Sequence, residues 1–126
     1  MEFWKKLNDY SNEYVKCGAV LRVPSVEKNR ENWYREDIVD LMVFYAGAAF
    51  KDAACGLICI SGHKAGRINA TFPLESGDGN GNGLRRDWLI SNWNRWVYME
   101  GDINDVWIRD PEPVQSMPSV FLEKRD

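Results

Sequence analysis

GLICISGHKAGRINATFP, residues 56–73, contains two strand-like runs joined by a short turn. The first run, residues 56–62, is apolar on both faces, which is typical of a strand inside a sheet. In residues 67–73 apolar and polar side chains alternate, which predicts a second strand. The connection is of ordinary hairpin length, and Gly62 and Gly66 suit the backbone angles of a turn. The stretch therefore predicts an antiparallel pair.

Further strands are predicted on both sides of this hairpin. AVLRVPSV (19–26), IVDLMVFYAG (38–47) and INDVWIRD (103–110) are rich in β-branched and aromatic residues. No helix recurs between strands, so the predicted class is α+β, with a mostly antiparallel sheet of about five strands. The polar segments at 27–37 and 74–83 are predicted to be loops.

Two helices are predicted from apolar residues at steps of three and four. One covers residues 1–18, where Phe3, Trp4, Leu7, Tyr10 and Tyr14 would share a face. The other covers residues 84–98, before the last strand. There Trp88, Trp93 and Trp96 form one stripe, which we assign to the core because such a stripe usually packs inside.

The composition predicts a single domain over residues 1–110, followed by a Pro-rich acidic tail at 111–126. The chain has no apolar run of membrane-spanning length and no secretory signal near Met1, so we expect a cytoplasmic protein. Three cysteines make an odd number, which favours reduced, buried thiols over a disulfide framework.

His63, the only histidine, raises the question of catalysis. Phosphate-binding loops place a lysine after the last glycine and before a helix. Here Lys64 lies between the glycines and a strand follows. A Cys–His pair would need a reactive thiol, yet Cys55 and Cys59 lie in or beside an apolar strand. On a single strand, Cys55, Cys59 and His63 would also be too far apart to hold one metal ion. We expect no metal site and no cofactor.

Charge is uneven along the chain, and residues 98–126 carry seven acidic and three basic side chains. This end would attract a basic partner, although solvated surface charge is an equally simple interpretation. A nucleic-acid module built on Arg85, Arg86 and Arg95 is disfavoured by Asp87 among them and by the net charge of −3.

Several short pieces, in order, resemble the immunity protein family numbered forty-five, which belongs to bacterial polymorphic toxin systems. The resemblance covers roughly residues 56–109. The matching pieces are Gly62, Lys64, Ala65 and Gly66 in the turn, Trp88-Leu89-Ile90 and Asn92-Trp93-Asn94 in the helix, and Val106 in the last strand.

This resemblance implies a non-enzymatic immunity protein that binds a cognate toxin domain and protects the producing cell, as in contact-dependent growth inhibition. Many such toxins are nucleases with basic active sites, which an acidic surface would attract. A small enzyme using His63 with a cysteine or carboxylate is the alternative. The predicted toxin-contacting residues are Glu100, Asp102, Asp105, Asp110 and Glu112, with His63 and Lys64 at the exposed turn.

Overall fold

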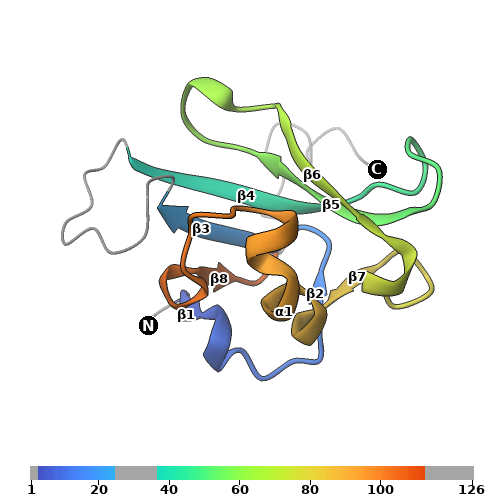
Figure 1. The fold of residues 1–126 in the computed structure, drawn as a ribbon, viewed down its shortest axis with the longest axis horizontal. Coiled ribbons are helices and arrows are strands. Elements are labelled where there is room, and N and C mark those ends of the chain that lie inside the picture. Colours follow the sequence, from blue (N-terminus) through green and yellow to red (C-terminus); the bar gives the residue numbers. More distant parts are fainter. Residues whose placement is uncertain (1–2, 25–36, 113–126) are drawn as a thin grey trace, which may run out of the picture.

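The fold is a six-stranded antiparallel sheet with one α-helix against one face (Figure 1). The computed structural model describes residues 3–24 and 37–112. The strands lie in the order β1-β8-β3-β4-β5-β6, and a second sheet pairs β2 with β7. Their bounds are β1 Lys5–Lys6, β2 Tyr14–Lys16, β3 Val20–Pro24, β4 Ile38–Tyr45, β5 Ala53–Cys59, β6 Ile68–Pro73, β7 Gly83–Arg85 and β8 Trp107–Arg109; helix α1 is Arg86–Trp96.

The predicted α+β class and antiparallel sheet are confirmed. The main sheet has one strand more than the predicted five, because the two-residue β1 pairs with β8 at its edge. Short 3-10 helices at Leu7–Asp9, Gly62–Lys64, Leu74–Ser76 and Ile103–Asp105 join the strands. The predicted loop at 27–37 and the predicted tail at 111–126 lie largely outside the described residues.

The predicted helix over residues 1–18 is wrong. Lys5 and Lys6 pair with Ile108 and Trp107, and the segment Tyr14–Lys16 pairs with β7. The apolar residues at steps of three and four do not share one buried face. Phe3, predicted on the apolar face of the helix, is 68% exposed, whereas Leu7 is fully buried between strand segments. Pairing with distant strands therefore overrides a local helical pattern that is only five apolar residues long.

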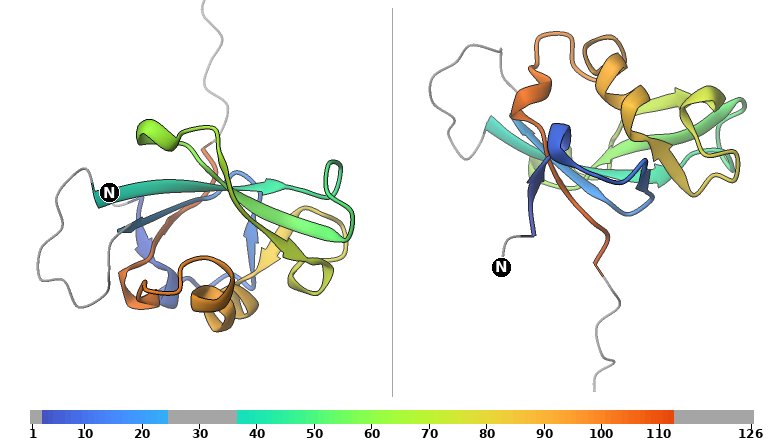
Figure 2. Two further views of the ribbon diagram at one scale, coloured as in Figure 1. Left: turned by 45° about the horizontal axis from the view of Figure 1, so that its top comes forward. Right: turned by 90° about the horizontal axis from the view of Figure 1, so that it is seen from below.

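One face of the sheet packs against α1. Leu21, Leu57 and Phe72 from the strands share the core with Leu89 and Trp93 from the helix. In the left view of Figure 2, α1 lies below the sheet, and the turn between β5 and β6 rises above it. No other element of the described chain covers the upper face, which we call the open face.

The stripe of three tryptophans on α1 is only partly a core feature. Trp93 is 1% exposed, as predicted. Trp88 is half-buried and meets the edge of Phe72 at a centroid distance of 5.4 Å. The core assignment of Trp96 is wrong, since this side chain is 39% exposed at the last turn of the helix and packs beside Trp88. The 11-residue helix α1 buries a narrower stripe than the spacing suggests, since only Leu89 and Trp93 are buried along it.

Candidate functional site

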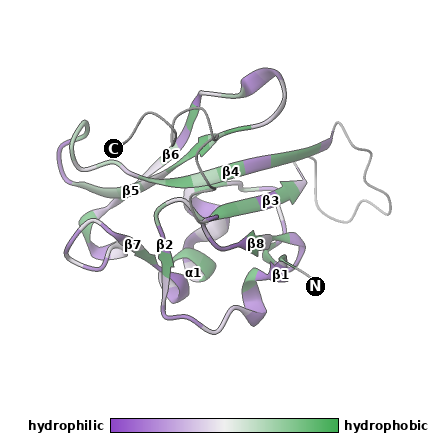
Figure 3. Ribbon diagram, turned by 180° about the vertical axis from the view of Figure 1, so that it is seen from behind, coloured by the Kyte–Doolittle hydropathy of each residue, from purple (hydrophilic) through white to green (hydrophobic). Residues whose placement is uncertain are grey.

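The turn between β5 and β6 holds the first two predicted site residues, His63 and Lys64. The predicted hairpin is confirmed, with Gly62 and Gly66 at positive φ angles of +70° and +89°. The backbone N–H of Gly66 donates to the carbonyl of Cys59 at 2.7 Å and closes the turn. Figure 3 shows this turn as hydrophilic, in contrast to the hydrophobic strands beneath it. Both residues are exposed, and the turn that carries them rises on the side of the sheet away from α1 (Figure 2).

The thiols near this turn are poor candidates for nucleophiles. Cys59 is 6% exposed and its Sγ donates to the carbonyl of Ser61 at 3.2 Å. Burial raises the pKa of Cys55 to about 12, with a further contribution from Cys17, whose Sγ lies 3.7 Å away. Burial also raises the pKa of Cys17. Because the thiolate is the reactive form, these surroundings do not favour a Cys–His catalytic pair.

The described residues also offer no support for a metal site or for a basic nucleic-acid-binding face on α1. Within residues 3–24 and 37–112, no three His, Cys, Asp or Glu side chains gather as a metal site would require. On α1, Arg86 pairs with Asp87 at 2.7 Å and also donates to the carbonyl of Tyr10. Arg86 therefore braces the fold, and it does not join Arg85 and Arg95 in a free basic face.

The five predicted acidic residues fall into two groups, one at each end of β8. Glu100, Asp102 and Asp105 lie before the strand, around the 3-10 helix Ile103–Asp105. Asp102 caps this helix by accepting a hydrogen bond from the N–H of Asn104 at 2.9 Å. Beyond the strand lie Asp110 and Glu112. The sequence placed these residues close together, but an extended strand separates the two groups.

The second acidic group is engaged within the molecule. Asp110 accepts a hydrogen bond from the hydroxyl of Tyr10, and Glu112 pairs with Arg109 at 3.0 Å. Burial, followed by this hydrogen bond, raises the pKa of Tyr10. No ion pair within the described part of the chain involves Glu100, Asp102 or Asp105, so the first group is the freer of the two.

A row of paired residues crosses the open face of the sheet. Lys6 on β1 lies opposite Trp107 on β8, Trp107 opposite Arg22 on β3, and Arg22 opposite Asp40 on β4. Side chains of a strand alternate between faces, so this row points away from the core that holds the neighbours of Arg22 on β3. Trp4, two residues before Lys6, lies on the same side as Arg22.

Side-chain contacts join Arg22 to Asp40 and Lys6 to Trp107 within this row, and join Arg22 to Trp4 beside it. The Arg22 guanidinium forms two hydrogen bonds with the Asp40 carboxylate, at 2.8 and 2.9 Å, which raises the pKa of Arg22. The same guanidinium lies over the Trp4 indole, 4.2 Å from the ring centroid. At the other end, the Lys6 ammonium lies 4.8 Å from the centroid of Trp107. Such cation–π contacts restrain both rings.

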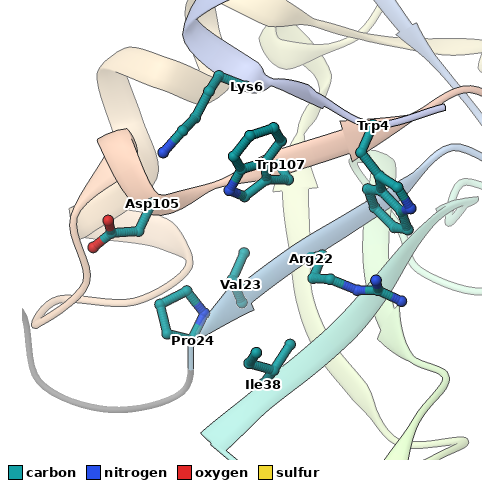
Figure 4. Close-up of a pocket in the computed structure, with 8 residues that line it drawn as sticks. All are labelled: Trp4, Lys6, Arg22, Val23, Pro24, Ile38, Asp105 and Trp107. Atoms are coloured by element: carbon teal, nitrogen blue, oxygen red, sulfur yellow. The ribbon is translucent and has the colours of Figure 1, made fainter. Parts of the chain in front are cut away.

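Between the two indoles is a pocket of about 300 Å³, which we call the tryptophan pocket (Figure 4). Its walls are Trp4 and Trp107, and Pro24 and Ile38 lie across from them where β3 ends and β4 begins. Lys6 and Asp105 project at the same side of its rim. The lining is mainly apolar with a few charged groups, which is the usual composition of a binding site.

A larger hollow of about 970 Å³, the hairpin groove, adjoins the tryptophan pocket between β4 and the turn of β5 and β6. The two hollows share Arg22 and Ile38, so they form one continuous surface. Three of the seven predicted site residues line it: Asp105 in the pocket, and His63 and Lys64 in the groove.

The sequence reasoning missed the residues at the centre of this surface, Trp4, Arg22 and Trp107. For Arg22 and Trp107, the neighbouring residues on the strand could have indicated which face they occupy. Arg22 lies between Leu21 and Val23, and Trp107 lies between Val106 and Ile108, all four of which are buried. A large or charged side chain between two buried neighbours of a strand must point to the opposite face. Trp4 carries no such signal, because the spacing of apolar residues in its segment predicts a helix.

Comparison with known proteins adds one match. A family model described as immunity protein 45 matches residues 7–108, from the first 3-10 helix to the middle of β8. The search of curated proteins and the search of solved structures each returned no match. None of the helices among the described residues has the length and apolar character needed to cross a membrane.

Proposed function

The chain belongs to the immunity protein 45 family, and from this membership we propose that it binds a cognate bacterial toxin domain and neutralises it. The observation that carries the proposal is the extent of the match. Residues 7–108 include α1, the strands from β2 to β7 and most of β8, so the match covers most of the fold and not one turn alone. Inhibition would come from occupying the toxin's surface, without chemical turnover.

The proposal extends to the class of toxin. We expect it to act in the cytoplasm of a competing bacterium and to be of the nuclease type, since such active sites are basic. Glu100, Asp102 and Asp105 support this proposal, because they form an acidic group in which no carboxylate has an ion-pair partner among the described residues. Opposite charges across an interface speed association more than they strengthen the final complex.

The predicted contacts at the hairpin turn remain part of the proposal. His63 and Lys64 are exposed and border the hairpin groove, which is a position from which they can reach a partner. Asp110 and Glu112 are exposed and are retained as contacts through the carboxylate oxygen that Tyr10 or Arg109 leaves unused.

Co-expression with the toxin domain encoded immediately upstream tests this function. The chain should restore growth of cells that carry the toxin domain, and the two proteins should copurify in an equimolar complex. A stoichiometric inhibitor gives protection that fails once the toxin is in molar excess. The His63→Ala variant should still protect when it is in molar excess over the toxin, because His63 is proposed as one contact among several and not as a catalytic group.

Two outcomes would contradict the proposal. One is growth restored without any complex, with protection by substoichiometric amounts of the chain. That result would point to an enzyme that modifies the toxin. The other is an upstream domain that arrests growth whether or not the chain is present.

A further inference from the structure

We propose that the toxin domain docks on the open face of the sheet, inserting one apolar side chain into the tryptophan pocket and placing carboxylates over the hairpin groove. This inference rests on the proposed function and adds to it the surface used and the chemistry of the partner. The acidic group of Glu100, Asp102 and Asp105 suits a basic surface of the toxin, whereas the open face suits an acidic segment of it.

The pocket has the size and lining for a single anchoring side chain. Its volume of about 300 Å³ is at the small end of the range for ligand sites, roughly 300–1,000 Å³. Trp107 is 38% exposed and Ile38 is 37% exposed at its mouth, so both retain apolar surface that a partner could cover. Tryptophans around an open apolar hollow are typical of the few residues that dominate binding at protein interfaces.

The pocket is also held in shape before any partner arrives. Asp40 fixes Arg22 through two hydrogen bonds, and Arg22 and Arg109 both lie over the Trp4 ring, with guanidinium carbons 4.2 and 5.5 Å from its centroid. Lys6 lies over Trp107 and donates to the carbonyl of Asn104. A partner that binds restrained side chains loses little conformational entropy in ordering them.

Charge selects the partner of this surface. Arg22 and Asp40 neutralise each other. Of the remaining groups around the two hollows, Lys6, Lys64 and Arg67 are basic and Asp105 is acidic. Across residues 3–24 and 37–112, no ion pair joins any of these three bases to a carboxylate. The surplus is positive, so the complementary segment carries Asp or Glu beside its apolar anchor.

Two tryptophans of nearly equal exposure provide the central experiment. Trp107 on the open face and Trp96 on the helix side are 38% and 39% exposed. Titration calorimetry with the purified cognate toxin domain should show that Trp107→Ala weakens binding at least about 30-fold, the usual loss for an anchor residue. Trp96→Ala should change the dissociation constant by less than about threefold. Thermal melting of both variants reports whether they remain folded.

A second variant tests the pocket without removing an aromatic ring. Ile38→Lys places a cation at the pocket mouth and should also weaken binding at least about 30-fold. For the groove, Lys64→Glu should lower the association rate at low salt, and the difference from the wild type should shrink as salt rises. Lys51→Glu is the matched control, since Lys51 is exposed in the turn at the opposite end of β5.

The outcomes separate this inference from the proposed function. If the wild type neither binds nor protects against the toxin domain, the proposed function fails. If the wild type binds and both Trp107→Ala and Ile38→Lys bind as tightly as the wild type, only this inference is overturned. Weaker binding by Trp96→Ala would then show that the toxin docks on the helix side. A wild-type dimer that Trp107→Ala converts to a monomer would show that the pocket serves a second copy of the chain instead.

Discussion

The hydroxyl of Tyr10 donates a hydrogen bond to the carboxylate of Asp110, joining the segment before β2 to the end of β8. Tyr10 is 5% exposed, whereas Asp110 is exposed. A residue predicted as a toxin contact therefore has a structural task, and the two roles can be separated by substituting one partner at a time.

Tyr10→Phe removes the hydrogen bond and leaves the carboxylate in place. We expect a loss of about 1 kcal/mol in the free energy of unfolding, because a part-buried hydrogen bond contributes about that much. Urea denaturation measures it. If Asp110 contacts the toxin, Asp110→Asn weakens binding and Tyr10→Phe does not; equal binding by both variants would remove Asp110 from the interface.

Trp93→Ala should destabilise the domain by about 3–5 kcal/mol, because it empties a fully packed site between α1 and the sheet. Trp96→Ala, three residues further on, should cost far less, since that ring is partly in solvent. Chemical denaturation of the two variants gives the comparison. Similar losses at both positions would mean that the exposed ring contributes to the core after all.

Gly56 tests the close packing of β4, β5 and β6. A Cβ added there would lie 2.5 Å from the carbonyl oxygen of Ala70 and 2.8 Å from the Phe44 ring. Because the nearest atom belongs to the backbone, the strands must shift, and we expect Gly56→Ala to cost about 1–3 kcal/mol or more. Gly62→Ala is the control: it meets no atom within 4 Å, so its cost is only that of a positive φ, about 1 kcal/mol. The melting temperatures should rank accordingly, and the reverse order would contradict the packing described for β5.

The pKa of Cys55 predicts how stability changes in alkaline solution. Burial raises this pKa from 9.0 to about 12, so the thiol is favoured in the fold. Below pH 9 both states keep the proton, and the contribution is intact. Between about pH 9 and 12 the unfolded chain loses its proton first, so stability falls as pH rises, by at most about 1.4 kcal/mol per pH unit from this group.

Cys55→Ala removes that part of the pH dependence. Urea denaturation at pH 8.5 and pH 10 should show a smaller loss for the variant than for the wild type. Equal losses would show that another group, such as Tyr10, accounts for the alkaline decline.

Glu100→Lys tests the acidic group before β8. Glu100 is exposed, and it is a cleaner choice than Asp102, whose carboxylate caps a 3-10 helix. If the toxin presents a basic surface here, the substitution should slow association severalfold at low salt, and this difference should shrink at high salt. Glu75→Lys makes the same charge change in the 3-10 helix Leu74–Ser76, which lies on the opposite side of the ribbon in Figure 1 from Ile103–Asp105, and should leave the rate unchanged. Equal rates for all three proteins would exclude Glu100 from steering.

The sequence predicted the strands well where a run of residues was apolar on both faces or alternated between apolar and polar side chains. β3, β4, β5, β6 and β8 were all predicted, and so was α1. It failed where pairing is decided by distant segments. Lys5 and Lys6 become a strand because β8 offers an edge, and β2 forms only because β7 lies beside it.

The candidate site was harder to predict for a similar reason. Trp4, Lys6, Arg22 and Trp107 come from three strands and the segment before β1, and only the register of those strands brings them together. Asp105, His63 and Lys64 were predicted from charge and from position in a turn, yet nothing in the sequence indicated that the pocket and the groove are continuous.

The alternation of Leu21, Arg22 and Val23 on β3 has an evolutionary consequence. Two of these side chains lie in the core, and the third lies in the row across the open face. Substitutions in that row can alter the surface while the residues that secure folding stay as they are. A lineage confronted with a changed toxin could thus acquire new recognition by single steps, each of which leaves a protein that still folds.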